Sequence, residues 1–387
     1  GEIPEGAHKF EITGREDKPY CTVCGGRCGE VAPHNTNYID YCAICGDWIP
    51  PVLAEDGFYE IKSFGNLMWF AEQVNAGNYD LNARLISNIS YGATFRTTEW
   101  TPIAGSSISD TTVGYRGIFD GQGYSIPLFP QTGLLTPEYD GAVLGLFGTL
   151  ADGAVVKNLS ISNRVEITFN RGGPNYTYDG DYTVYFGLVA GRVLEGATVS
   201  GCRVANGTVS ISKGVLGAIV GVNYGTVENC VSYNMTLTGP AGRVGGIVGD
   251  YNGGELINCY TTYASLGSVA SGYVGTAIDS EAGVSNARIA SGEIAYMMNT
   301  YIGNPSFWYQ TVGSGGPVGR SEYNVVDKIV YLHNFGDIVF YSNNEFKVVI
   351  KSDYTIPAGK TFLLPSGTTL EIAQNVTLTN EGTFIEN

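Results

Sequence analysis

The chain has 387 residues, of which 54 are glycine, and its formal net charge is −16. This glycine content disfavours an all-helical fold, because each interior glycine costs a helix about 1 kcal/mol. The hydrophobic content of 43% excludes a disordered chain. An acidic chain without a Lys/Arg cluster also lacks the positive charge needed to bind nucleic acid or anionic membranes.

Residues 1–50 are rich in Cys, Gly and Pro, and we expect them to form a small zinc-ribbon-like module. Four of their cysteines have the spacing C-x2-C-x17-C-x2-C, which falls in the zinc-ribbon range. Four thiolates form a closed, tetrahedral structural zinc site, and such a site stabilises a segment too small for its own core. The predicted zinc ligands are Cys21, Cys24, Cys42 and Cys45.

Two features leave this assignment open. Cys28 is a fifth thiol beside the first pair, and His8 or His34 could replace one thiolate. The competing interpretation is disulfide pairing, which an exported protein would favour. The adjacent Pro50 and Pro51 favour an extended linker, so we place the first domain boundary there.

Residues 51–130 are expected to lead into a repeat region and to contain a short helix near residues 63–77. Ser63 is a plausible N-cap, and Gly77 a plausible C-terminal stop. The residues Leu67, Phe70, Ala71 and Val74 recur at the spacing of one helix face. Short strands are expected on both sides, at residues 59–61, 83–86, 115–119 and 124–128.

Residues 131–289 repeat one pattern four times, with a period of about 28 residues. Each copy has a Gly-apolar-apolar-Gly box, a glycine turn and a short strand that ends in Asn-Cys or an equivalent pair. We therefore predict an all-β fold, a parallel β-helix or β-solenoid, in which each strand pairs with its equivalent one coil further on. Equivalent residues would form a buried ladder, in which cysteine acts as a small apolar residue; they are Leu159, Cys202, Cys230 and Cys259. The copy at 187–204 has Gly201 where the other copies have Asn, which leaves the geometry of that turn open.

Residues 165–186 interrupt the period and are expected to form a protruding hairpin. Its candidate binding residues are Tyr176, Tyr178, Asp179 and Asp181. The tyrosines could stack on sugar rings or anchor a protein partner, or simply pack within the hairpin. The two aspartates, with Asn175, could bind calcium, or could belong to a solvated loop.

Residues 290–324 are expected to close the array with a short helical stretch at 292–300 and an aromatic cluster that caps its end. Residues 325–387 are expected to form narrower β-solenoid-like rungs. The chain opens at Gly1 without an initiator Met, so we expect a processed or partial sequence from which any signal peptide has been removed.

Several blocks between residues 57 and 315 resemble GLUG-repeat proteins of bacterial surfaces. The box followed by Gly-Thr-Val-Glu-Asn-Cys at 225–230 looks like the GLUG repeat. The segment Phe-Asp-Gly-Gln-Gly at 119–123 is similar to the usual lead-in, and Ser-Gly-Glu-Ile-Ala-Tyr at 291–296 to the usual closing segment. Similar coils occur in adhesin-like proteins and in streptococcal immunoglobulin A peptidases, whose catalytic zinc motif lies in another domain. The His-Glu-x-x-His motif is missing from this sequence, so no peptidase activity carries over.

The resemblance implies a non-enzymatic, adhesin-like protein that is secreted or held at a bacterial cell surface. Its β-helix would act as a rigid stalk and as a binding surface for a host protein or glycan. The alternatives are a carbohydrate-active β-helix enzyme, a polysaccharide lyase or hydrolase, and a glycan-binding module that uses the aromatic hairpin. The repeats contain no histidine, which argues against Ser-His-Asp or Cys-His chemistry. Their aspartates, Asp152 and Asp250, fall at expected turns, and Arg192, Arg203 and Arg243 lie at different positions of the repeat.

Overall fold

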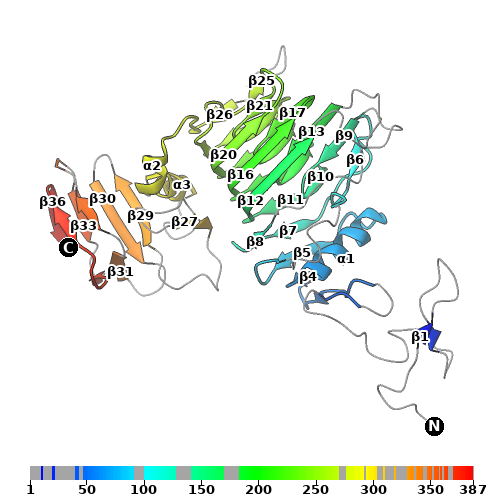
Figure 1. The fold of residues 1–387 in the computed structure, drawn as a ribbon, viewed down its shortest axis with the longest axis horizontal. Coiled ribbons are helices and arrows are strands. Elements are labelled where there is room, and N and C mark those ends of the chain that lie inside the picture. The colour runs from blue at the N-terminus through cyan, green and yellow to red at the C-terminus, as the bar shows by residue number, and fades with distance from the viewer. Residues whose placement is uncertain are drawn as a thin grey trace, which may run out of the picture.

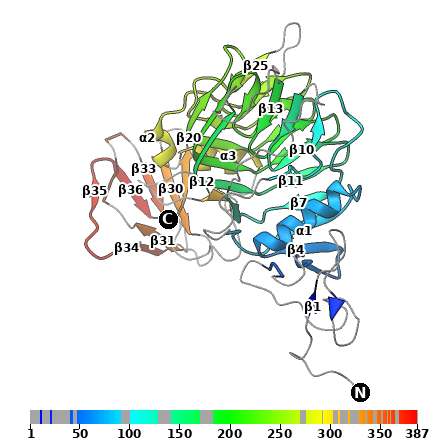
Figure 2. The ribbon, with the colours of Figure 1, turned by 45° about the vertical axis from the view of Figure 1, so that its right-hand side comes forward.

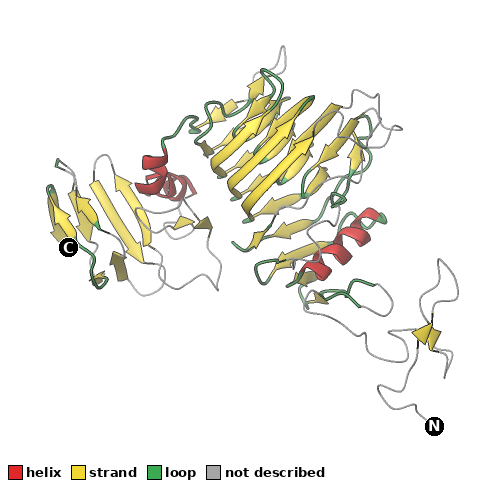
Figure 3. Cartoon of the chain, in the orientation of Figure 1, coloured by secondary structure: helices red, strands yellow, loops and turns green. Residues whose placement is uncertain are grey.

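The protein is mostly β-structure with parallel sheets, as a computed structural model shows (Figures 1 and 3). The structure describes residues 10–11, 20–21, 40–42, 47–90, 100–127, 141–169, 183–269, 276–291, 293–302, 308–309, 318–319, 329–334, 337–342, 347–350, 353–356, 358–359, 361–364 and 369–386. The all-β prediction is therefore confirmed at the level of fold class. Among the described residues, no helix is long and apolar enough to cross a membrane.

Helix α1 (Phe64–Asn75) forms where its sequence predicts it. The Ser63 hydroxyl accepts a hydrogen bond from the backbone N–H of Asn66 at 3.1 Å, which caps the first turn. The buried face carries Leu67, Phe70, Ala71 and Val74. The helix lies at the N-terminal end of the sheets (Figures 1 and 2), where the Phe70 ring packs 6.0 Å from the ring of Phe119.

Four large sheets make up the body of the molecule. The nine-stranded sheet contains β3 (Val52–Leu53), β4 (Phe58–Ile61), β5 (Asn82–Leu85), β7 (Ile118–Asp120), β11 (Val155–Lys157), β15 (Thr198–Ser200), β19 (Thr226–Glu228), β23 (Glu255–Ile257) and β26 (Thr276–Ile278). The β8–β24 sheet contains β8 (Ser125–Ile126), β12 (Ser160–Phe169), β16 (Arg203–Ile211), β20 (Val231–Thr238) and β24 (Tyr260–Thr261).

The other two large sheets have five strands each. The β6–β21 sheet contains β6 (Ser106–Ser107), β9 (Gly141–Leu144), β13 (Thr183–Gly187), β17 (Gly214–Gly217) and β21 (Val244–Gly245). The β10–β25 sheet contains β10 (Phe147–Leu150), β14 (Ala190–Val193), β18 (Val220–Asn223), β22 (Val248–Tyr251) and β25 (Ser268–Val269).

The chain visits these four sheets in turn, and from β9 to β20 each strand pairs in parallel with the strand four places later. Equivalent residues of successive repeats therefore stand side by side. One such row is fully buried and runs through Phe119, Val156, Val199, Val227 and Leu256. Burial of a Val or Leu side chain contributes about 1.5–3 kcal/mol, so this row is a substantial part of the core.

The glycines of the boxes allow the β6–β21 and β10–β25 sheets to approach closely. A Cβ atom on Gly221 would lie 2.9 Å from the nitrogen of Phe186, and one on Gly191 would lie 2.6 Å from the nitrogen of Leu144. Real Cβ atoms essentially never come within 3.0 Å of another heavy atom in this way. The box is thus a packing motif, because only glycine fits between the two backbones.

The corners after β11, β15, β19 and β23 of the nine-stranded sheet each carry a residue with positive φ. Asn158, Asn229 and Asn258 have φ of 55°, 51° and 50°, and Gly201 has a φ of 63°. Glycine and asparagine both enter the left-handed region readily. The Gly201 copy therefore keeps the same turn, which answers the question its sequence left open.

The three cysteines of the repeats form the expected buried ladder. Cys202, Cys230 and Cys259 are fully buried and are not in disulfides. The backbone N–H of each of the first two donates to the cysteine sulfur one repeat further on, at 3.4 Å. The ladder ends at Ser280, whose hydroxyl accepts from the backbone N–H of Cys259 at 3.0 Å.

Two short helices, α2 (Asn286–Ser291) and α3 (Glu293–Ile302), follow the repeats and confirm the helical stretch expected there. They take part in a second hydrophobic cluster with the fully buried Trp308, against Val231, Tyr233 and Tyr260 of the β8–β24 sheet. These sheet residues alternate along their strands with others that face the first core, so they lie on the opposite face of the sheet. Trp308 therefore covers the side of the array, whereas the sequence suggested a cap over its end.

The described residues of the C-terminal segment form short strands, and the β-solenoid-like arrangement expected for them stays a prediction. Parallel pairs join β30 (Asp337–Ser342), β33 (Thr361–Leu364) and β36 (Thr383–Glu386), β31 (Lys347–Ile350) with β34 (Thr369–Ile372), and β32 (Tyr354–Ile356) with β35 (Leu378–Asn380). Antiparallel pairs join β29 (Ile329–Asn334) with β30, β27 (Trp308–Tyr309) with β28 (Val318–Gly319), and β1 (Phe10–Glu11) with β2 (Tyr20–Cys21).

Candidate functional site

The predicted metal site falls mainly outside the described residues. Cys24 and Cys45 lie outside them, and Cys21 is described only as the last residue of β2. Cys42 is fully buried, and its backbone N–H donates to the carbonyl oxygen of Asp47 at 2.9 Å. Asp47 therefore lies next to Cys42. Among the described residues no group of metal-ligating side chains is assembled, so the zinc site stays a prediction.

The segment around Cys42 packs against the leading segment. The Trp48 ring contacts Phe64 edge-on at 5.6 Å, and the Asn66 amide donates to the carbonyl oxygen of Ile49 at 2.9 Å. Pro51, expected in an extended linker, is buried. Trp48 and Ile49 are therefore attached to the start of α1.

The predicted binding residues Tyr176, Tyr178, Asp179 and Asp181 lie outside the described residues. The flanks of their segment are strands of two different sheets, because residues 165–169 pair with β16 and residues 183–187 pair with β17. The two flanks therefore do not pair with each other. The prediction of a hairpin over residues 165–186 is wrong for these flanks. Of its aromatic residues, Phe186 is a buried core residue and Tyr185 is half-buried.

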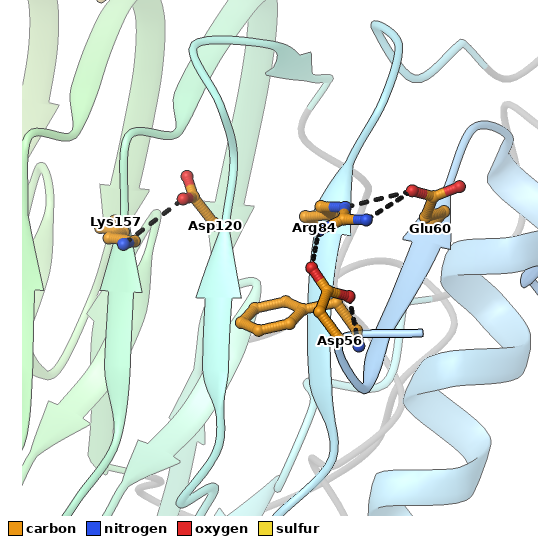
Figure 4. A network of polar contacts seen from close by, with 6 residues as sticks. Asp56, Glu60, Arg84, Asp120 and Lys157 are labelled. Atoms are coloured by element: carbon orange, nitrogen blue, oxygen red, sulfur yellow. Dashed lines mark hydrogen bonds and ion pairs between the residues drawn. The ribbon is translucent and has the colours of Figure 1, made fainter. Parts of the chain in front are cut away.

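A row of alternating charge follows one face of the nine-stranded sheet (Figure 4). The row places Glu60, Arg84, Asp120 and Lys157 side by side in register. Arg84 Nη2 contacts Glu60 at 2.6 Å, and Lys157 Nζ lies 3.4 Å from Asp120. Arg84 also binds Asp56, and this bond lowers the pKa of the Asp56 carboxyl. Exposed ion pairs contribute only about 0–1 kcal/mol to the free energy of unfolding. We therefore interpret this row as a link between the leading segment and the first repeat, and not as a binding or catalytic site.

A second polar group lies where the β6–β21 and β10–β25 sheets meet, and at its centre is the buried Arg192. This side chain is only 3% exposed. Its Nη1 donates to the carbonyl oxygen of Ile108 at 2.7 Å, and its Nη2 to the hydroxyls of Thr149 and Ser106 at 3.0 and 3.2 Å. Nη2 also donates to the carbonyl oxygen of Asp110. Burial lowers the pKa of Arg192, and these uncharged oxygens compensate for its lost hydration.

Two repeats further on, Asp250 stands in the same row as Arg192, with Val222 between them. Asp250 is a strand residue of β22 and is 2% exposed, although its sequence suggested a turn. Its Oδ2 forms an ion pair with Nη1 of Arg243, whose side chain is 49% exposed. The buried carboxylate thus orients a guanidinium that remains half in solvent.

Two tyrosines complete this group. Tyr224 is 39% exposed and directly follows β18, and Tyr185 lies in β13. Burial and the nearby Tyr224 raise the pKa of Tyr185, and Arg192, Arg243 and Asp250 also act on it electrostatically. The side chains of Arg192, Tyr224, Arg243 and Asp250 therefore lie within electrostatic reach of this phenol. We call Tyr185, Arg192, Tyr224, Arg243 and Asp250 the Tyr–Arg cluster.

Sequence reasoning missed this cluster, although its signal is present. Thr149, Arg192, Val222 and Asp250 each directly follow the second glycine of a box. Aligning the four copies on that glycine places these residues in one row, as the sheet register does. This alignment could not predict that Tyr185 and Tyr224 belong to the cluster, because they occupy different positions of the repeat.

The chain matches no protein-family profile and shows no significant match to a curated protein sequence. It is similar to a solved structure from Bacteroides ovatus named "putative immunoglobulin A1 protease", with 18% identity and a TM-score of 0.41. The similarity covers 69% of this chain and 93% of the other. At this level the similarity says nothing about activity.

Proposed function

We propose that this protein is a non-enzymatic, adhesin-like protein of a bacterial surface or of the secreted fraction. In this proposal residues 131–289 are GLUG-type repeats that form a parallel β-helix. The β-helix acts as a rigid spacer and presents a binding surface to a host protein or glycan. A structural zinc held by Cys21, Cys24, Cys42 and Cys45 would stabilise the N-terminal module.

The observation that carries the proposal is the parallel pairing of successive repeats in all four large sheets from β9 to β23. Each repeat contributes one strand to each sheet, so neighbouring repeats share backbone hydrogen bonds on every side. The rows inside are apolar and fully buried, as in the row from Phe119 to Leu256. A stack of this kind resists bending and local unfolding, because opening one repeat exposes the buried faces of two others.

The polar groups of the described repeats support a structural and binding role over catalysis. Asp250 of the repeats is paired with Arg243, and Asp120 of the leading segment is paired with Lys157. A polysaccharide hydrolase would instead need one carboxyl group free to donate a proton and another free to act as base or nucleophile.

Limited proteolysis tests the spacer role. Trypsin cleaves after Lys and Arg, and the stack from β13 to β24 contains Arg192, Arg203, Lys213 and Arg243. We expect one resistant fragment that is uncut at all four positions after prolonged digestion of the intact protein. Rapid cleavage at Arg203 or Lys213 would contradict a rigid stack.

A screen for cleavage of host and plant polysaccharides tests the non-enzymatic part. We expect no turnover above that of a heat-denatured control. Reproducible turnover that is abolished by Asp250→Asn or Asp120→Asn would replace this proposal with a carbohydrate-active enzyme.

A further inference from the structure

Two asparagines of the chain are followed directly by glycine, Asn206 and Asn252, and the two pairs have different surroundings. We propose that Asn252 is a site of spontaneous deamidation, at which the protein modifies itself with water as the only co-reactant. Asn206 is protected from the same reaction by the strand that contains it. This inference concerns a covalent change of the chain and does not depend on the proposed function.

The reaction joins the side chain of an asparagine to the next backbone amide. The backbone nitrogen of Gly253 attacks Cγ of Asn252, so that a bond from this nitrogen to Cγ forms and the bond from Cγ to Nδ2 breaks. The amide proton of Gly253 and the Nδ2 group leave together as ammonia. Water then opens the cyclic succinimide at either carbonyl, which yields aspartate or isoaspartate. Glycine favours the attack because it has no Cβ beside the nucleophilic nitrogen and its backbone is conformationally free.

Asn252 and Gly253 lie in a corner that is longer than its equivalent in the preceding repeat. The corner between β22 and β23 is formed by residues 252–254, whereas the corner between β18 and β19 is formed by residues 224–225. Gly253 is exposed, and its φ is 96°. The lengthened corner therefore brings the nucleophilic amide of the Asn-Gly pair to the surface.

The two ends of this corner are fixed by hydrogen bonds, and its middle is not. The backbone N–H of Asn252 donates to the carbonyl oxygen of Asn223 at 2.9 Å. The backbone N–H of Glu255 donates to the carbonyl oxygen of Gly225 at 2.7 Å. Among the described residues, neither the amide N–H of Gly253 nor the side chain of Asn252 has a hydrogen-bond partner. Such an exposed turn rearranges at a lower free energy than paired strands do, so the two reacting groups can meet.

The other Asn-Gly pair lies inside β16, where both reacting groups are engaged. Gly207 stands in register with residues of both neighbouring strands, β12 and β20, so its amide belongs to the hydrogen-bonding ladder of the sheet. The Asn206 Oδ1 accepts a hydrogen bond from Nδ2 of Asn234 at 2.7 Å. Asn206 is exposed, whereas Asn252 is half-buried. Exposure alone would therefore favour Asn206, and the hydrogen-bonding of the backbone favours Asn252.

The reaction replaces a neutral amide with a carboxylate in the corner between Asp250 and Glu255. Each event therefore adds a negative charge to a chain that is already acidic. When the product is isoaspartate, it also lengthens the backbone of the corner by one atom. Both changes can be measured directly, the first by ion exchange and the second by fragmentation of the modified peptide.

The test follows the intact, folded protein in mildly alkaline buffer, where the backbone nitrogen loses its proton more readily. Samples taken over time are unfolded and digested briefly with trypsin, which releases residues 204–213 with Asn206 and residues 244–288 with Asn252. Mass spectrometry identifies a deamidated peptide by the exchange of ammonia for water. We expect Asn252 to deamidate at least about ten times faster than Asn206, with both aspartate and isoaspartate as products.

The matched control is the same chain unfolded in urea, in which both pairs are free and should deamidate at rates within about twofold of each other. On ion exchange, the acidic species that accumulates in the folded protein should be lost in Asn252→Ser and kept in Asn206→Ser. An unchanged Asn252 after a time that converts the unfolded chain, or equal rates for the two pairs in the folded protein, would overturn the inference. No partner or polysaccharide enters this experiment, so its result is independent of the tests of the proposed function.

Discussion

The substitution Gly221→Ala tests the role of the glycine box in the stack. The added Cβ would lie 2.4 Å from the carbonyl oxygen of Gly191 and 2.9 Å from the nitrogen of Phe186. Ordinary van der Waals contact begins at 3.4 Å, so backbone atoms would have to separate by about 1 Å at the closest contact. These obstacles are the backbones of two sheets, which cannot rotate away as a side chain can.

Overpacking of a well-packed core costs about 1–3 kcal/mol, and we expect Gly221→Ala to lie at or above the upper end of this range. The matched control is Gly242→Ala. Gly242 has nothing within 4 Å of its would-be Cβ and a φ of +71°, so alanine there meets only left-handed backbone strain of about 1–2 kcal/mol.

Urea unfolding followed by tryptophan fluorescence measures both variants against the unchanged protein. The buried Trp100 and Trp308 report on the two hydrophobic clusters. Equal midpoints for Gly221→Ala and Gly242→Ala would refute the reasoning, because it would show that the box glycines are not needed for close approach of the sheets.

Three further predictions concern buried groups. The Tyr251 hydroxyl is buried without a hydrogen-bond partner among the described residues, so Tyr251→Phe should raise the free energy of unfolding by about 1–3 kcal/mol; a lower urea midpoint would contradict this. Burial raises the pKa of Tyr115, Cys202 and Cys230 above their ordinary values. The folded protein holds these protons more tightly than the unfolded chain, so stability is complete below the unfolded pKa values, about 8.5 for Cys and about 10 for Tyr, and falls as the pH rises above them. Urea midpoints at pH 7 and pH 10.5 measure this, and an equal or higher midpoint at pH 10.5 would count against it. Elemental analysis of protein purified without added metal should find about one zinc per chain, and Cys42→Ser should lose it; oxidised thiols with little zinc would favour disulfides instead.

Local signals in the sequence predicted local structure well. Helix α1 begins after Ser63 and is followed by a positive φ at Gly77 because its cap, apolar face and terminal glycine all act within a few residues of each other. The shared turn of Asn229 and Gly201 likewise depends on backbone freedom that each residue carries by itself.

Pairing between distant residues was harder to predict. Asp250 lies in a strand because neighbouring coils pair with it on both sides, whereas the sequence around it suggested a turn. The flanks of the expected hairpin pair with β16 and β17 for the same reason. The ion pair of Arg243 with Asp250 joins the residue before β21 to a strand of the β10–β25 sheet, so only the spatial arrangement shows that these two side chains meet.

Native-state hydrogen exchange tests the central claim, a continuous rigid stack, most directly. We predict that the amides of β13 to β20 are the slowest in the chain, with opening free energies close to that of global unfolding. Their backbone hydrogen bonds join coils on both sides. Exchange of the β16 or β19 amides at the rate of an unstructured chain, while the flanking strands stay protected, would contradict the account.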